Sequence, residues 1–223
     1  MEQITKEELL DVIGKFELGD NTEVVSVEPY GSGHINDTFR LEVKEDGQEK
    51  LYILQRMNKD IFKNQKELME NILQVTSFLT DKIKAQGGDP NRETLQVIPT
   101  KEGKSYLIEA NGDGWRVYPF ITDSLSFDKA DTPEAMKKSG YAFGNFQYLL
   151  SDFPAEKLHE TIPDFHNTPD RLRKFKEALA ADTMHRAADI PEEIDFVLNH
   201  EADCSHMTDL LAAGKTASPC YTQ

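Results

Sequence analysis

The stretch that decides the fold runs from Tyr30 to Val43 and reads YGSGHINDTFRLEV. Two glycines, Gly31 and Gly33, lie in a short polar segment. Valines precede it at 24, 25 and 27, and apolar residues alternate after it, which predicts a strand on each side. A hairpin with glycines at its tip brings backbone N–H groups close to a ligand, because no Cβ stands in the way. Such turns commonly bind phosphate.

The glycine pattern leaves two interpretations open. Asn36 occupies the place of the third glycine in the dinucleotide-binding fingerprint, and a strand rather than a helix follows, so that fingerprint fails. A glycine-rich lid over nucleotide phosphates, as in kinases, fits better. An ordinary hairpin turn without a ligand is the alternative.

Composition indicates a globular protein with a sizeable core. The 223 residues are 38% hydrophobic and 29% charged, and the net charge is −15. A charge of this sign disfavours non-specific binding to nucleic acid. We find neither a secretory segment nor an apolar run of membrane-spanning length, so we expect a cytoplasmic protein that binds no membrane. In that compartment we expect Cys204 and Cys220 to form no disulfide.

Periodicity predicts mixed secondary structure before residue 122. Thr5 and Glu8 form a capping-box pattern for a helix whose apolar positions continue to Phe16, with Gly19 as its stop. Asp46-Gly47 is a hairpin signal. Strands are predicted at 24–29, 38–43, 50–57, 94–99, 105–110 and 115–121, and a long helix at 66–86 that ends at the glycines 87 and 88.

The second half reads as helical. Residues 121–131 are polar and linker-like, so the predicted boundary lies near residue 122 and separates a β lobe, 1–121, from a helical lobe, 122–223. Thr132-Pro133, Thr168-Pro169 and Pro191 each begin a predicted helix. The fold class is therefore α+β with a largely antiparallel sheet.

Four segments carry a resemblance to a known family. They are EPYGSGHIN at 28–36, YILQ at 52–55 with MN at 57–58, WRVY at 115–118 and FHNTP at 165–169. In this order they resemble the aminoglycoside phosphotransferase superfamily, and within it the N-acetylhexosamine 1-kinase branch. The resemblance runs from about residue 10 to Lys215. It implies a protein-kinase-like fold, with an antiparallel β-sheet lobe carrying one long helix and an incomplete α-helical lobe. It also implies that ATP and Mg²⁺ are used to phosphorylate the anomeric hydroxyl of an N-acetylhexosamine.

The resemblance also assigns residues to the nucleotide. Glycine-turn residues would cover the phosphates, and the segment 118–120 would be a hinge whose backbone pairs with adenine. Gln55 stands where most relatives have a lysine on the phosphates, and an amide cannot supply that charge; Arg56 is predicted to point to the other face of its strand. From the residues alone, Trp115, Tyr118 and Phe120 are also consistent with sheet core. The predicted nucleotide-binding residues are Gly31, Ser32, Gly33, His34, Asn36, Gln55, Tyr118 and Phe120.

The groups that perform transfer in the family are not found in this sequence. Relatives supply a catalytic base in an H-N-D segment and metal ligands in I-D-x-D, and neither motif occurs here, so we predict no catalytic and no metal-binding residues. After Lys215 the chain reads TASPCYTQ, where a relative reads roughly LPLRVTHND. Because the genetic code is degenerate, TASPCYTQ and a stop can be encoded by several DNA sequences. One of these, read after deletion of its first base, translates as LPLRVTHN. We therefore hypothesise a frameshift after Lys215, an aberrant tail at 216–223 and a fragment that is inactive alone; a natural end is the alternative.

Three functions remain open at this point. The first is an N-acetylhexosamine kinase, with nucleotide and a sugar acceptor as partners. The second is a kinase for another small alcohol, such as choline, homoserine or an aminoglycoside. The third is a non-enzymatic binding protein that retains a kinase-like lobe. Helices left without partners also predict self-association.

Overall fold

The computed structural model describes residues 4–31, 33, 35–125 and 129–215. Ser32, His34, Cys220 and the predicted aberrant tail lie outside the described residues. The chain forms two compact units, Met1–Pro154 and Ala155–Gln223. The residues predicted as a linker, 121–131, therefore lie inside the first unit, together with helix α4 (Pro133–Leu149).

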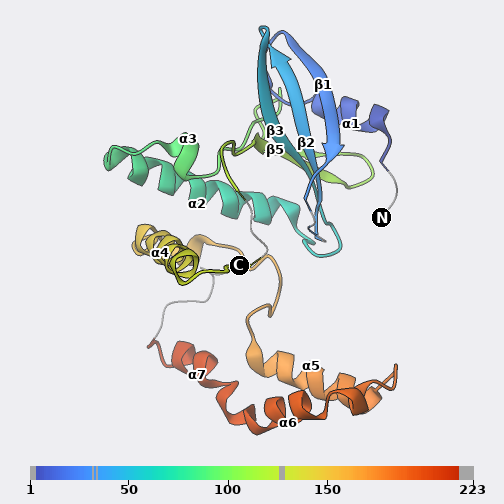
Figure 1. Ribbon diagram of the computed structural model, residues 1–223, viewed down its shortest axis with the longest axis vertical. Helices are drawn as coiled ribbons and strands as arrows, with labels where there is room; N and C mark the ends of the chain where they lie inside the picture. Colours follow the sequence, from blue (N-terminus) through green and yellow to red (C-terminus); the bar gives the residue numbers. More distant parts are fainter. Residues whose placement is uncertain (1–3, 32, 34, 126–128, 216–223) are drawn as a thin grey trace. The chain divides into compact units, whose positions relative to one another are not determined.

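The first unit is built on one antiparallel sheet in the order β1-β2-β3-β5-β4 (Figure 1). Its strands are β1 (Thr22–Pro29), β2 (Asp37–Glu45), β3 (Gln48–Met57), β4 (Leu107–Ile108) and β5 (Gly114–Pro119). The turn between β2 and β3 is the predicted hairpin: Asp46 and Gly47 both have positive φ, 48° and 81°, as a two-residue primed turn requires. The α+β class and the antiparallel sheet are confirmed.

Helix α1 (Lys6–Ile13) closes the apolar face of this sheet. The predicted capping box is present, because Thr5 accepts from the Glu8 N–H and the Glu8 carboxylate accepts from the Thr5 N–H. Strand alternation turns every second side chain toward α1. The resulting core contains Leu9, Val12, Ile13 and Phe16 from the α1 segment, and Phe39, Leu41, Val43, Tyr52, Leu54, Trp115 and Val117 from the sheet.

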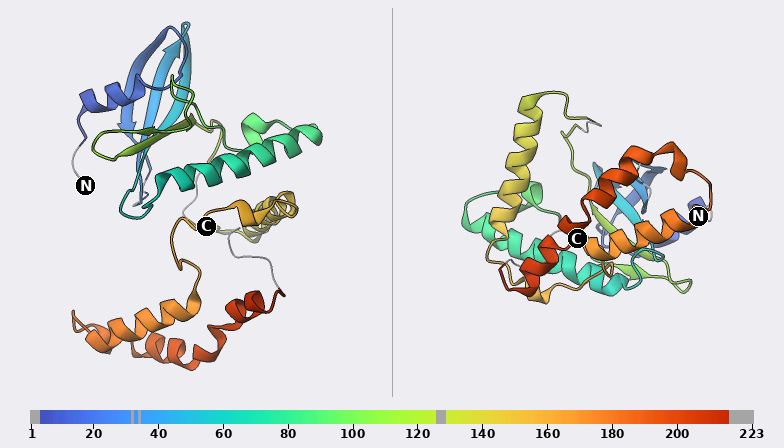
Figure 2. Two further views of the ribbon diagram at one scale, coloured as in Figure 1. Left: turned by 180° about the vertical axis from the view of Figure 1, so that it is seen from behind. Right: turned by 90° about the horizontal axis from the view of Figure 1, so that it is seen from below.

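Helix α2 (Gln65–Ala85) runs below the strands in both side views (Figures 1 and 2). Asn64 caps its start, and Gly87 has φ 77° at its predicted end, where the Gly88 N–H donates to the Ile83 carbonyl. Lys82 joins α2 to the end of α4 through the Leu149 carbonyl at 2.8 Å and the carboxylate of Asp152.

The second unit contains three α-helices among its described residues: α5 (Thr168–Ala181), α6 (Pro191–Asn199) and α7 (His206–Ala212). Large apolar side chains on these helices are exposed, among them Phe196 and Met207, each 63% exposed. Over the described part of the chain, none of the helices has the length and apolar character that crossing a bilayer requires.

Several predicted elements were wrong in extent or kind. Helix α1 ends at Ile13 rather than continuing toward Gly19, because the chain turns at Gly14 and buries Phe16 beside Thr100. Residues 94–99 form only an isolated bridge through Ile98, and 105–110 shrink to the two residues of β4. A short helix, α3 (Pro90–Glu93), was missed. So was α7, whereas α5 begins at Thr168 as predicted, with Asn167 as its cap.

The tightly packed face predicts a large effect for one truncation. Leu54→Ala removes a fully buried side chain at the centre of the sheet, and we expect it to lower the free energy of unfolding by about 2–5 kcal/mol. Urea unfolding followed through Trp115, the single tryptophan, reports on this unit directly. The same truncation at Leu125, which is 84% exposed, should change stability by less than about 0.5 kcal/mol. Equal effects of both variants would contradict this core.

Candidate functional site

The other side of the sheet carries polar and aromatic side chains together with the buried Ile53 and Met57, and we call it the polar face. Strand pairing places Thr38, Gln55 and Arg116 directly opposite one another on β2, β3 and β5. Their side chains form a chain of hydrogen bonds: Gln55 Nε2 donates to Thr38 Oγ1 at 2.9 Å, and Gln55 Oε1 accepts from Arg116 Nε at 3.0 Å and Nη2 at 2.6 Å. The amide of Gln55 is thus held at both ends. We call these three side chains the Gln55 row.

Arg116 is a half-buried cation with neutral neighbours. Its Nη1 lies 3.8 Å from the sulfur of Met69 on α2, and its guanidinium lies 5.9 Å from the centre of the Tyr118 ring. Among the described residues, no carboxylate lies within 4.0 Å of its nitrogens. Burial lowers the pKa of the Arg116 guanidinium, although arginine remains charged at neutral pH. Farther along β2 on the same face lie Arg40, which is opposite Glu28 on β1, and then Glu42.

Aromatic side chains lie beside the Gln55 row. Tyr118 is two residues beyond Arg116 on the same face, and burial raises the pKa of its hydroxyl, an effect that the Arg116 charge partly offsets. The rings of Tyr30 and Phe120 meet edge to face, with centroids 5.3 Å apart. The Phe120 N–H donates to the Leu51 carbonyl at 3.0 Å, so this N–H is already engaged within the protein.

The glycine turn begins at the end of the same row. The Tyr30 N–H donates to the Thr38 carbonyl at 2.8 Å and closes the β1–β2 pair. Gly31 has φ 82°, which favours glycine, and a Cβ at Gly31 or Gly33 would meet nothing within 4 Å. Asn36 ties the turn to the segment after β3, because its Oδ1 accepts from the Asn58 N–H at 2.9 Å. Gly31, Gln55, Tyr118 and Phe120 thus lie along one face or its edge, whereas the Asn36 amide oxygen is already engaged.

Arg56 lies on the apolar side, as predicted. Its guanidinium bonds Asp37 at 2.6 Å and Asp113 at 3.1 Å, and Lys59 approaches Asp113 at 2.8 Å. Burial tends to raise the pKa of Asp113, but the hydrogen bonds and charges of Lys59 and Arg56 outweigh it and lower that pKa overall. The charge of Arg56 is therefore neutralised within the protein.

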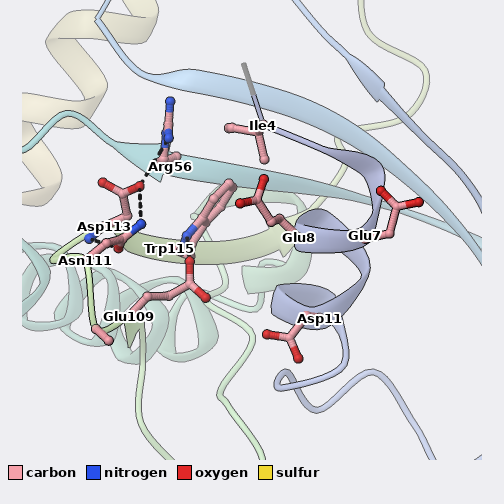
Figure 3. A pocket seen from close by; sticks show the side chains of 10 residues that line it. Ile4, Glu7, Glu8, Asp11, Arg56, Glu109, Asn111, Asp113 and Trp115 are labelled. Atoms are coloured by element: carbon pink, nitrogen blue, oxygen red, sulfur yellow. Dashed lines mark hydrogen bonds and ion pairs between the residues drawn. The ribbon is translucent and has the colours of Figure 1, made fainter. Parts of the chain in front are cut away.

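Sequence analysis missed a pocket of about 480 Å³ beside this ion-pair network (Figure 3). The α1 carboxylates line one side, and Asn111 and Asp113 line the other; the Trp115 Nε1–H donates to Glu109 at 3.1 Å. The pocket would repel phosphate, because its charged lining residues are Arg56 and the acidic Glu7, Glu8, Asp11, Glu109 and Asp113. No signal in the sequence joins α1 to residues 109–115, since only the folded sheet brings them together.

Comparison with known families adds no assignment, because no protein-family model matches the chain. Within the described residues, no group of three or more His, Cys, Asp or Glu side chains could hold a metal ion. These residues therefore offer no protein-only metal cage, and we assign no step to a metal. The polar face could bind an anion next to a planar ring, because it combines an arginine with neutral neighbours, aromatic rings and a glycine turn.

The Asp113 network predicts a pH-dependent contribution to stability. We expect Asp113→Asn to lower the free energy of unfolding by about 1–3 kcal/mol near pH 7, because it removes a buried charge from Arg56 and Lys59. The pKa of Asp113 is lower in the folded than in the unfolded chain, where it is about 3.9. The difference between the two proteins should thus be complete above the unfolded pKa and disappear as the pH falls through the folded pKa.

Urea unfolding of both proteins between pH 3 and pH 7 measures this difference. The control is Asp60→Asn, whose carboxylate is 90% exposed and 3.8 Å from Lys63. We expect no measurable pH-dependent difference for that variant. A penalty for Asp113→Asn that grows in acid would contradict the direction of the pKa shift.

Proposed function

We propose that this chain is the nucleotide-binding part of an ATP-dependent phosphotransferase with a protein-kinase-like fold. The observation that carries the proposal is the polar face of the sheet, where Arg116 lies between aromatic rings and the start of a glycine turn. Aromatic rings suit a purine base, and an arginine without a carboxylate partner suits phosphate. The sequence resemblance to N-acetylhexosamine 1-kinases supports the same interpretation and supplies the proposed acceptor, the anomeric hydroxyl of an N-acetylhexosamine.

A second candidate is a protein that binds nucleotide without transferring phosphate. It is favoured by the absence of the H-N-D and I-D-x-D motifs from this sequence, because the resemblance implies that they supply the base and the metal ligands for phosphoryl transfer. A kinase for choline, homoserine or an aminoglycoside would share the same polar face, so the acceptor has to be tested directly. The exposed apolar residues of α5–α7 support self-association as a further part of the proposal.

We expect the purified chain to bind ATP, with Phe120 contributing through its ring. Phe120→Ala should weaken ATP binding by roughly 5- to 100-fold, the range that corresponds to loss of one base–aromatic stacking contact. Isothermal titration calorimetry measures the dissociation constants. The control is Tyr141→Ala on α4, which is 77% exposed and should leave ATP affinity unchanged. Absence of ATP binding by the unaltered chain would reject the proposal.

The acceptor is tested by ADP release. We expect no release from this chain with N-acetylglucosamine, because the H-N-D and I-D-x-D motifs are absent from its sequence. Release with N-acetylglucosamine or N-acetylgalactosamine would show that other residues of this chain perform the transfer, and would support the proposed acceptor. Release with choline, homoserine or an aminoglycoside would assign a different acceptor. ATP binding without release with any of these acceptors would favour the non-enzymatic candidate.

A further inference from the structure

Two arginines on adjacent strands of the sheet have opposite electrostatic surroundings. Arg56 on β3 contacts two carboxylates, those of Asp37 and Asp113. Arg116 on β5 contacts the neutral amide of Gln55 and the thioether of Met69. Amide and thioether groups accept hydrogen bonds without cancelling a charge. The polar face therefore retains a net positive charge at Arg116, in a protein whose total charge is −15.

A partly buried charge without a counter-ion is costly, since it gives up hydration and gains no ion pair. The cost falls when an anionic ligand supplies the missing charge. Two lysines that line a second hollow of this unit already have such partners within the protein: Lys15 lies 2.6 Å from Asp11, and Lys104 lies 2.7 Å from Glu102. Unlike these two lysines, Arg116 has no carboxylate partner among the described residues, so an external anion would lower the cost of burying its charge.

The Gln55 row also fixes where the guanidinium lies. Gln55 holds Nε and Nη2, so the Arg116 side chain extends from β5 toward β3. Its Nη1 group meets only a weak acceptor, the Met69 sulfur at 3.8 Å. A phosphate oxygen is a far stronger acceptor for these remaining N–H donors. The glycine turn starts at Tyr30, whose N–H bonds the Thr38 carbonyl at the far end of the same row.

We infer that Arg116, positioned by Gln55, is the cation that binds the phosphates of the nucleotide. This inference rests on the proposed function and refines it. Most members of the superfamily that the sequence resembles have a lysine at this position, whereas here Gln55 holds an arginine from the neighbouring strand over β3. The ligand class is a polyphosphate, with Arg116 at one end of the Gln55 row and the glycine turn at the other.

Gln55→Glu is the sharpest test, because it changes one amide to a carboxylate of the same shape. The new carboxylate would pair with Arg116 within the protein and remove the charge offered to a ligand. We expect at least a tenfold loss of affinity for inorganic tripolyphosphate and for ATP, with adenosine binding unchanged and no decrease in the unfolding temperature. Gln48→Glu makes the same change at an exposed position of β3 and should leave all three affinities unaltered.

Arg116→Gln provides a second measurement, because it removes the cation itself. It should also weaken tripolyphosphate binding at least tenfold, and circular dichroism checks that the sheet is retained. All titrations use the full chain at one fixed ionic strength, since salt screens these interactions. Tripolyphosphate binding that is absent from the unaltered chain, or equal in the unaltered chain and Gln55→Glu, would overturn the inference.

The same titrations separate this inference from the proposed function. If ATP and adenosine bind but Gln55→Glu leaves ATP affinity unchanged, the nucleotide proposal stands and the role of Arg116 is rejected. The opposite result is also possible: tripolyphosphate binding depends on Gln55 and Arg116, adenosine does not bind, and ATP binds no tighter than tripolyphosphate. In that case the anion site stands and the nucleotide proposal is rejected.

Discussion

The structure depends on the alternation of side chains across one antiparallel sheet. Phe39, Leu41, Leu54 and Val117 all face α1, and burial of that face stabilises the first unit. The residues between them are then free to be polar, because they point the other way. A register slip of one residue on β3 would bury Gln55 and move Arg56 to the polar face. The packed core therefore determines which side chains can meet a ligand.

The contrast between the two arginines shows how partners divide structural from binding roles. Arg56 lies among carboxylates, and its interactions strengthen the end of the sheet. Arg116 has the same chemical group, yet an amide holds it in place and leaves its charge available. In a strongly acidic protein, attraction of an anion has to come from such local arrangements rather than from the overall charge.

Much of the first unit follows from local sequence signals. The Thr5–Glu8 capping box, the Asp46-Gly47 turn and the glycines after α2 each act within a few residues, and all three were predicted. Residues 94–110 look strand-like, but pairing there depends on the space beside β5, which no local pattern reports. The Gln55–Arg116 bond joins residues 61 positions apart, so only the strand register could have revealed it. The sequence could therefore indicate Gln55 as a candidate, but not the arginine that it holds.

The paired geometry of Gln55 and Arg116 also constrains how such a protein can evolve. A lysine at position 55 would place two cations side by side on neighbouring strands, which is unfavourable unless position 116 has first become neutral. Loss of Arg116 alone would leave the amide oxygen of Gln55 without its donors. Whichever of the two positions changes first, the intermediate has either two adjacent cations or an amide oxygen without its donors. The effect of a substitution at one position therefore depends on the residue at the other. Descendants of a common ancestor should therefore carry one of two combinations, lysine with a neutral residue or glutamine with arginine, and seldom a mixture.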